Sequence, residues 1–377
     1  MYSVICQAIS QINSRDWNQL VLDNNPFLQH AFLSALETHQ CVGEHFGWLP
    51  RHIALYEDNE LVAALPLYIK YNSYGEFVFD QSWAEAWQQH GYAYFPKLVS
   101  AIPYTPATGQ RLLVKKGLSA TYYPLLLNQL QDMAEQMNAS GFHILFPRQI
   151  ESDWLNEQGM MLRHDCQFHW HNHHYTHFDD FLAQLSSRKR KNIIKERRAV
   201  ASAGVTLKRL DGEQASEQDW QKMASFYART FEQKWGVATL NLGFFQELAK
   251  KMPRQILLVL AEQQGQCIAG ALMFVSDSRL YGRFWGCDKN IKALHFEACY
   301  YQGIEYCIEQ QLEVFEPGAQ GEHKVARGFI PVLTRSAHYL LNNQFDASIK
   351  HFIKHEKENV MNYIADINRH LPYKKNK

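Results

Sequence analysis

The stretch ILLVLAEQQGQCIAGALMFVSDSRLYGRFWG, residues 256–286, decides the fold class. It contains two apolar runs, 256–260 and 267–275, on either side of the polar turn 262–265, and then a further strand candidate at 280–286. Short apolar runs bounded by turn residues are typical of largely buried strands. The stretch therefore predicts a hairpin followed by a third strand.

An earlier part of the chain presents the same order of elements. There the hairpin and the third strand are residues 52–56, 61–69 and 76–80. Each copy continues with a helical pattern, a short strand before a proline and a closing strand. In the first copy these are residues 120–137, 142–146 and 161–170. In the second copy they are residues 294–311, 313–316 and 332–341. Six elements in one order indicate an internal repeat. We expect an α/β protein with mixed sheets (α+β) in which one domain occurs twice, as residues 1–172 and 173–377.

The composition excludes several classes of protein. The 377 residues are 46% hydrophobic, and 38 basic residues balance 38 acidic ones. Such a chain is not disordered, and its zero net charge argues against binding nucleic acid over its whole surface. No apolar run approaches the ~20 residues of a membrane span, and the N-terminus lacks the pattern of a secretory signal. Seven scattered cysteines without a CxxC pair argue against disulfides and cysteine zinc sites. We expect a cytoplasmic protein.

The strand 279–286 of the second copy is a candidate for one wall of a ligand groove. By simple alternation, Arg279, Tyr281, Arg283 and Trp285 share one face of this strand. The helix that follows begins near His295, and a helix N-terminus favours phosphate or carboxylate. The alternative interpretation is a loop with solvated lysines, with His295 as a structural residue.

The most informative stretch is FEPGAQGEHKVARGF, residues 315–329. It follows a buried strand, and α/β folds place ligands at the ends of such strands. Glu316 is a candidate general base because burial at a strand end would raise the pKa of its carboxyl group. Further polar groups and a glycine crowd into the same loop, namely Gln320, Gly321, Glu322, His323, Lys324 and Arg327. The alternative is a glycine-rich turn with solvated charges.

The basic stretch SSRKRKNIIKERR, residues 186–198, holds seven basic residues and one glutamate. At helical spacing, its basic residues form one stripe that includes Arg188 and Lys191, with Asn192 beside them. Such a patch could bind a polyanion, or it could be an ordinary solvated face.

Five histidines lie between residues 169 and 177. On a strand, three of them would share a face, which is a possible metal arrangement. No carboxylate or cysteine completes a recognisable metal-ligand spacing, so we favour edge-strand or linker histidines and expect no metal.

Together, residues 186–198, 282–310 and 315–329 resemble stretches of the bacterial predicted N-acyltransferases, a FemAB-like family of the GNAT superfamily. The resemblance implies two tandem GNAT-like acyltransferase domains. It also implies that the acyl donor binds where the strands 279–286 and 313–316 splay apart. The usual Q/RxxGxG/A pyrophosphate loop of GNAT proteins is absent, so the donor is left open between acyl-CoA and aminoacyl-tRNA.

The resemblance implies an N-acyltransferase that acts on an amine acceptor, such as a cell-wall (peptidoglycan) precursor, with its active site in the second domain. Glu316 or His323 would be the base, and Tyr281 or Tyr301 would stabilise the oxyanion or the leaving group. Donor or substrate binding would fall to Arg188, Lys191, Asn192, Arg283, Trp285, His295, Gln320, Gly321, Lys324 and Arg327. The alternative is a non-catalytic protein that binds RNA or an anionic precursor through the basic helix 186–198.

Overall fold

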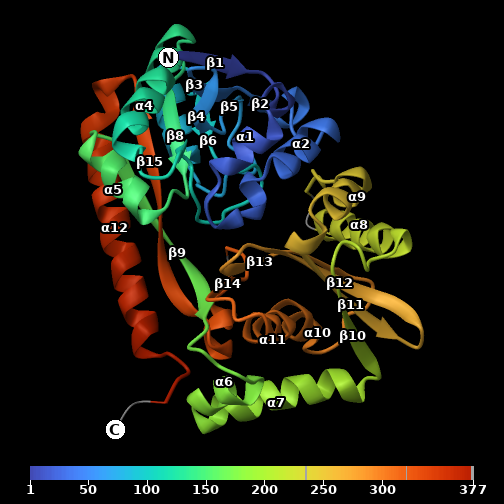
Figure 1. Ribbon diagram of the computed structural model, residues 1–377. Coiled ribbons are helices and arrows are strands. Elements are labelled where there is room, and N and C mark those ends of the chain that lie inside the picture. Colours follow the sequence, from blue (N-terminus) through green and yellow to red (C-terminus); the bar gives the residue numbers. More distant parts are fainter. Residues whose placement is uncertain (234–235, 320, 375–377) are drawn as a thin grey trace. The chain divides into compact units, whose positions relative to one another are not determined.

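The computed structural model describes residues 1–233, 236–319 and 321–374 (Figure 1), and its chain divides into two compact units. Unit 1 comprises Met1–Asp165 and Leu333–Asn362, and unit 2 comprises Cys166–Val332 and Tyr363–Lys377. Both units are therefore discontinuous in sequence, whereas the expected domains, 1–172 and 173–377, are each continuous.

The difference arises because the closing strands are exchanged. Strand β15 (Ile330–Leu340) comes from the second half of the chain but pairs antiparallel with β8 (Gly141–Leu145) of unit 1. Strand β9 (Met161–His171) comes from the first half but pairs antiparallel with β14 (Val314–Glu316) of unit 2. Each unit is thus completed by a strand from the other copy of the repeat.

Unit 1 contains two sheets, in the strand orders β1-β3-β4-β7 and β2-β5-β6-β8-β15. Its remaining strands are β1 (Tyr2–Cys6), β2 (Trp48–Pro50), β3 (His52–Glu57), β4 (Glu60–Leu65), β5 (Tyr68–Lys70), β6 (Lys97–Ser100) and β7 (Leu113–Val114). Its helices are α1 (Ser14–Gln19), α2 (His30–Thr38), α3 (Gln81–Gln89), α4 (Ser119–Gln136), α5 (Gln149–Glu157) and most of α12 (Asp346–Arg369).

Unit 2 is built on the strand order β10-β11-β12-β13-β14-β9. Helices α10 and α11 lie on one face of this sheet, and α8 lies on the other (Figure 1). The strands are β10 (Val205–Leu210), β11 (Ile256–Gln263), β12 (Gln266–Val275) and β13 (Arg279–Cys287). The helices are α6 (Phe178–Gln184), α7 (Ser187–Ser202), α8 (Glu217–Glu232), α9 (Leu242–Lys251), α10 (Leu294–Phe296), a π-helical turn (Glu297–Tyr301) and α11 (Gln302–Glu309).

The repeat is visible in how the strands pair. In unit 1, β5 pairs antiparallel with β6, and β6 runs parallel to β8. In unit 2, β12 pairs antiparallel with β13, and β13 runs parallel to β14. Each unit thus has one parallel pair whose second strand is followed by an exchanged strand. This confirms the expected α/β fold class with mixed sheets.

The strand expected at residues 76–80 is wrong. This segment is a loop in which Phe77 has a left-handed backbone (φ 59°), and the counterpart of β13 is β6 instead. The loop buries its two acidic residues against Lys97, whose ammonium lies 2.8 Å from Glu76 and 2.5 Å from Asp80. The expected run 61–69 is also divided, into β4 and β5, because Pro66 between them lacks the N–H group of a strand ladder.

No helix in the part of the chain that the structure describes is long and apolar enough to cross a membrane.

Candidate active site in the second unit

The parallel pair of unit 2 separates after three residues. Strand β13 is in register with β14 from Arg279↔Val314 to Tyr281↔Glu316. There β14 ends, while β13 continues to Cys287. The next residue after β14 is Pro317, which has no N–H group with which to extend the ladder. The gap between the two strands lies at the carboxyl end of a parallel pair, where α/β sheets bind ligands.

A cavity of about 120 Å³ lies beside this gap. Gly282 lets the chain after β14 pass close by, since a Cβ atom there would meet Pro317 Cα at 3.2 Å. The cavity is lined by Ala271, Leu272, Met273, Gly282, Arg283, Phe284, Trp285, His295, Cys299, Tyr300 and Pro317. Three of the expected binding residues, Arg283, Trp285 and His295, therefore share one cavity.

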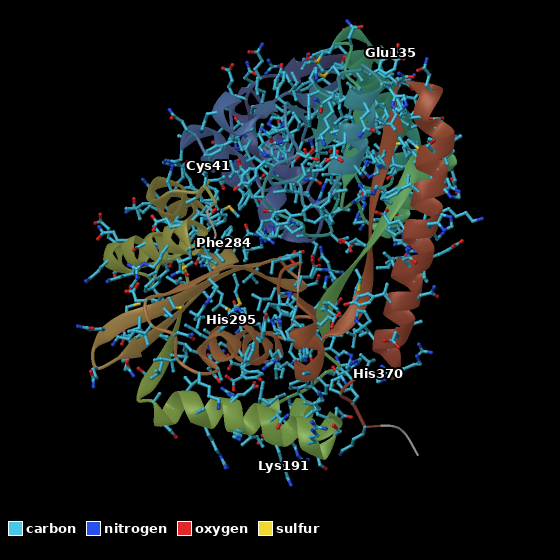
Figure 2. All side chains as sticks on the ribbon, turned by 180° about the vertical axis from the view of Figure 1, so that it is seen from behind. Cys41, Glu135, Lys191, Phe284, His295 and His370 are labelled. Carbon is cyan, nitrogen blue, oxygen red and sulfur yellow. The ribbon has the colours of Figure 1, made fainter. Side chains whose placement is uncertain are left out.

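The alternation expected along β13 is wrong at Arg283. The register with β12 passes from Met273↔Gly282 to Leu272↔Phe284, so Arg283 is an extra residue in a β-bulge. A bulge re-aims the side chains beyond it. Trp285 consequently packs on the helix side against His295, with ring centroids 5.4 Å apart, while Phe284 turns to the α8 side (Figure 2). The bulge is what directs Trp285 towards the helices.

Tyr300 and His323 form a hydrogen-bonded pair at this cavity, with 2.8 Å between the hydroxyl and Nε2. Burial raises the pKa of Tyr300, so its hydroxyl stays protonated near neutral pH. Burial, together with Arg327 and Lys324, lowers the pKa of His323 below its ordinary value of 6.5, so its imidazole is neutral at pH 7. The pair can donate a proton at Tyr300 and accept one at His323.

Lys324 is buried beside the same cavity, with 2% of its surface exposed. Its ammonium donates to the Gly318 carbonyl at 2.7 Å. Burial lowers the pKa of Lys324 to about 7, with Cys299 opposing that shift and Arg283 adding to it. Burial likewise lowers the pKa of Arg283 to about 10. Two partly desolvated cations here would interact strongly with an anionic group.

Glu316 is held by other side chains of unit 2. Its Oε1 accepts a hydrogen bond from Arg279 Nη1 at 2.8 Å, and its Oε2 lies 3.8 Å from His169 Nε2. Burial and Arg279 lower the pKa of His169 to about 3, so that imidazole is neutral. Neither Glu316 nor Tyr281 lines the cavity, although the two are in register. Their catalytic roles remain predictions.

Tyr301 and Arg327 belong to a separate network. The Tyr301 hydroxyl donates to Glu196 of α7, and Arg327 Nη2 donates to the same carboxylate at 2.6 Å. The Arg327 guanidinium also covers the ring of Phe296 at 3.3 Å. The structure therefore places Tyr300, and not Tyr301, at the cavity.

The sequence reasoning missed Tyr300 for an identifiable reason. The segment Glu297–Tyr301 is a π-helical turn, which shifts the side chains after it relative to a regular α-helix. Buried Glu297 accompanies this turn and pairs with Arg197 of α7 at 3.0 Å. The only available signal was that polar Glu297 and Gln302 interrupt an otherwise apolar helix.

The basic stripe lies away from the cavity. Arg188, Lys191 and Asn192 are exposed on α7, and Lys191 points away from the rest of unit 2 (Figure 2). None of them lines the cavity at the strand gap. The structure thus separates the predicted donor-binding residues into an exposed stripe and a buried group.

Gln320 lies outside the described residues. Gly321 has φ +115°, and a Cβ atom there would lie 2.4 Å from the His323 ring, so glycine at this position makes room for that imidazole. Within the described ranges, no group of three or more His, Cys, Asp or Glu side chains could hold a metal ion.

The sequence matches the profile of a known protein family. The profile of the FemAB-like family, described as peptidoglycan biosynthesis/recognition, matches residues 8–375. A search of curated proteins found no match.

The fold is similar to that of solved structures at low sequence identity. FemX is 12% identical, with a TM-score of 0.55 over 93% of this chain and 100% of FemX. The C-terminal domain of a candidate lysylphosphatidylglycerol synthetase from Agrobacterium fabrum is 8% identical, with a TM-score of 0.55 over 92% and 96%. L-PGS from Bacillus licheniformis is 10% identical, with a TM-score of 0.50 over 81% and 88%.

Proposed function

The chain belongs to the FemAB-like family, which is described as peptidoglycan biosynthesis/recognition, and we propose that unit 2 transfers an acyl or aminoacyl group to the amine of a peptidoglycan precursor. The observation that carries this proposal is the gap between β13 and β14. A proton-transfer pair, the buried Lys324 and the half-buried Arg283 lie beside one cavity there.

The transfer reaction consists of three changes in the substrates. The amine nitrogen attacks the donor's carbonyl carbon, the bond to the leaving oxygen or sulfur breaks, and one proton passes from the amine to the leaving group. His323 can take the proton of the amine, and Tyr300 can supply a proton to the leaving group. Lys324 and Arg283 would stabilise the negative charge that develops on the carbonyl oxygen, or a phosphate of the donor.

The exposed stripe on α7 favours aminoacyl-tRNA over acyl-CoA as the donor. A tRNA extends far beyond a cavity of about 120 Å³ and needs cations outside it. The stripe residues Arg188, Lys191, Lys195 and Arg198 are all exposed. The same stripe also suits the second candidate function, a non-catalytic protein that binds RNA. The two functions differ in whether an amide bond is formed.

Neutralising the stripe is expected to weaken tRNA binding in a salt-dependent way. Each phosphate contact contributes about 0.7–0.9 to the slope of log K against log salt concentration, so a fourfold variant should lower the slope by about 3. This is measured by titrating labelled tRNA at several salt concentrations. The variant replaces Arg188, Lys191, Lys195 and Arg198 with glutamine.

A matched control removes four exposed cations elsewhere in unit 2. It replaces Lys222, Lys250, Lys251 and Arg254 with glutamine. If both fourfold variants had the same slope as the wild type, α7 would not be the tRNA-binding surface.

The rate of transfer is expected to have a bell-shaped pH dependence. On the acid side, activity falls as His323 becomes protonated, below the ordinary histidine value of 6.5. On the alkaline side, activity falls above about pH 7, as Lys324 loses its proton. Lys324→Arg should move the alkaline limb upwards, because a guanidinium stays charged. An unchanged alkaline limb in Lys324→Arg would remove Lys324 from the assignment.

A further inference from the structure

The backbone of His323 is tied to α7 through Arg327. Arg327 donates from Nη1 to the His323 carbonyl at 2.7 Å. Its other nitrogens hold the carboxylate of Glu196, with Nη2 at 2.6 Å from Oε1 and Nε at 3.2 Å from Oε2. A bidentate contact of this kind fixes orientation as well as distance. One arginine therefore connects a carboxylate of α7 to one member of the proton-transfer pair.

Aromatic packing extends this connection to the other member of the pair, Tyr300. The Arg327 guanidinium lies 3.3 Å from the centroid of the Phe296 ring. That ring stacks on Tyr300, with centroids 6.0 Å apart, and its centroid lies 5.7 Å from that of the His323 ring. A displacement of Arg327 would therefore disturb both rings, whose hydroxyl and Nε2 are 2.8 Å apart.

Glu196 is itself held in place by buried neighbours. The hydroxyl of fully buried Tyr301 donates to its carboxylate. The next residue, Arg197, pairs with Glu297 at 3.0 Å and with Glu305 at 2.7 Å, which fastens α7 to the π-helical turn and to α11. Helix α7 thus carries the basic stripe on its exposed face and contacts the site through Glu196 on another face.

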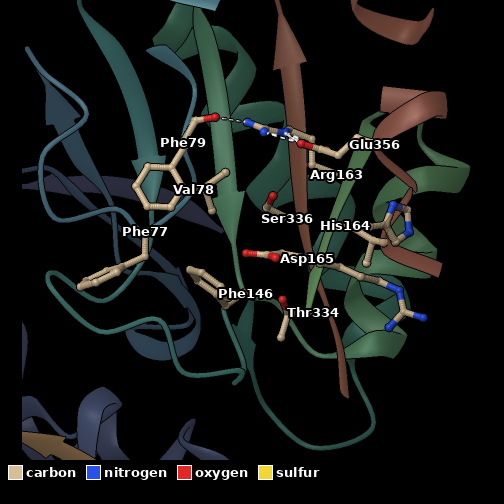
Figure 3. Close-up of a pocket in the computed structure, with 12 residues that line it drawn as sticks. Phe77, Val78, Phe79, Phe146, Arg163, His164, Asp165, Thr334, Ser336 and Glu356 are labelled. Atoms are coloured by element: carbon tan, nitrogen blue, oxygen red, sulfur yellow. Dashed lines mark hydrogen bonds and ion pairs between the residues drawn. The ribbon is translucent and has the colours of Figure 1, made fainter. Parts of the chain in front are cut away.

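An arginine of unit 1 makes the same set of contacts at a residue that cannot transfer a proton. Arg163 donates from Nη2 to Glu356 Oε1 at 2.6 Å, and from Nη1 to the Phe79 carbonyl at 2.8 Å (Figure 3). Its side chain and that of Glu356 are 9% and 19% exposed, against 9% and 25% for Arg327 and Glu196. The Arg163–Glu356 pair is therefore a reference for the purely structural effect of such a contact.

We propose that Glu196 is a positioning residue of the transferase site. By fixing Arg327, its carboxylate holds the His323 backbone, so that the imidazole stays within hydrogen-bond reach of Tyr300. This inference rests on the proposed function, because it concerns the same proton-transfer pair. One helix then serves both donor binding, through its exposed stripe, and the placement of the base.

Glu196→Ala is expected to lower the single-turnover rate of transfer about 10- to 100-fold, because a small misplacement of a reacting group has an effect of this size. It should not weaken binding of aminoacyl-tRNA, since the stripe stays intact. Glu196→Gln keeps an acceptor oxygen for Arg327 and should restore part of the rate. Glu356→Ala is the matched control. It breaks the reference pair and should cost a similar amount of stability in denaturant unfolding, but transfer at the wild-type rate.

Nitrogen-15 NMR of histidine-labelled full-length protein gives a readout that does not need activity. The Nε2 resonance of His323, identified by its loss in His323→Gln, reports the hydrogen bond with Tyr300. We expect this resonance to move towards that of a solvated imidazole in Glu196→Ala and to stay in place in Glu356→Ala. If Glu196→Ala failed to fold, Glu196→Gln would be expected to show a smaller shift of the same sign.

The two proposals can fail separately. If the wild type formed no amide bond but Glu196→Ala still moved the His323 resonance, the transferase proposal would fail and the positioning of His323 by Glu196 would stand. An unmoved resonance in the folded Glu196 variants, wild-type transfer by Glu196→Ala, or an equal loss of rate in Glu356→Ala would overturn the positioning role.

Discussion

Replacing Lys324 with methionine is expected to lower the rate of acyl transfer about 100- to 1,000-fold, the range found when one stabilising donor is removed from an oxyanion site. The ammonium of Lys324 is buried beside the cavity at the β13–β14 gap, close to Arg283 and Cys299. No neutral side chain can replace its charge. Single-turnover measurement of transfer at pH 6.5 gives the effect on the chemical step.

The same substitution is expected to preserve or increase stability, which separates a catalytic role from a structural one. The pKa of Lys324 is about 7 in the folded chain, against about 10.4 in an unfolded one. Between these values the unfolded state binds more protons, so this residue makes the wild type more stable as pH rises from 7 to 10. Lys324→Met should lose that pH dependence, and its gain in stability over the wild type should be largest near pH 6.

Lys222→Met is the control, because Lys222 is an exposed lysine of α8 in the same unit. It should retain full activity. If Lys324→Met transferred at a rate near that of Lys222→Met, Lys324 would have no catalytic role. If Lys324→Met failed to fold, the expected effect on stability would be wrong, and the pH profile of Lys324→Arg would then test the catalytic role.

Replacing Lys97 with methionine is expected to have the largest effect on stability, a loss of about 3–5 kcal/mol in the free energy of unfolding. Its ammonium is fully buried and contacts Glu76, Asp80 and the Ser73 hydroxyl. The pKa of Asp80 is lowered to about 2 because Lys97 and His143 outweigh burial, which alone would raise it. Without Lys97, no cation among the described residues would contact the buried carboxylate of Asp80. Denaturant unfolding followed by circular dichroism measures the loss.

A surface ion pair of the same unit provides the comparison. Lys115 lies 2.6 Å from Glu60, and their side chains are 29% and 69% exposed. Lys115→Met should therefore cost less than about 1 kcal/mol. In addition, Asp80→Asn should restore part of the stability that Lys97→Met loses, since it removes the buried, unpaired negative charge of Asp80. Equal losses in Lys97→Met and Lys115→Met would contradict the assigned network.

Local patterns in the sequence predicted the strands and helices of the repeat, but not the elements between them, such as α2, α8 and α9. The runs 52–56, 256–260 and 267–275 are apolar enough to indicate β3, β11 and β12 by themselves, and the helical pattern 120–137 likewise indicates α4. The segment 76–80 failed because EFVFD alternates like a strand, while the partner that buries its acidic residues, Lys97, lies 17 to 21 residues away. Likewise, no local pattern reveals that β9 and β15 are exchanged.

The candidate site could be predicted only in part. The family resemblance implied that β13 and the strand before the loop 315–329 are neighbours, and β13 does pair with β14. The bulge at Arg283 and the π-helical turn at Glu297–Tyr301 were not predicted, and each changes which side chains face the cavity. Both depend on packing against other elements, such as the contact of Arg197 with Glu297.

The most direct test of the central claim is a transfer assay followed by mass spectrometry. The full chain is incubated with peptidoglycan precursors that carry a free amine, and with either aminoacyl-tRNA or acyl-CoA. We predict a precursor that gains the mass of one aminoacyl or acyl group through a new amide bond, at a rate that Lys324→Met lowers about 100-fold or more. No transfer above the protein-free rate with either donor, or equal transfer by wild type and Lys324→Met, would contradict the account.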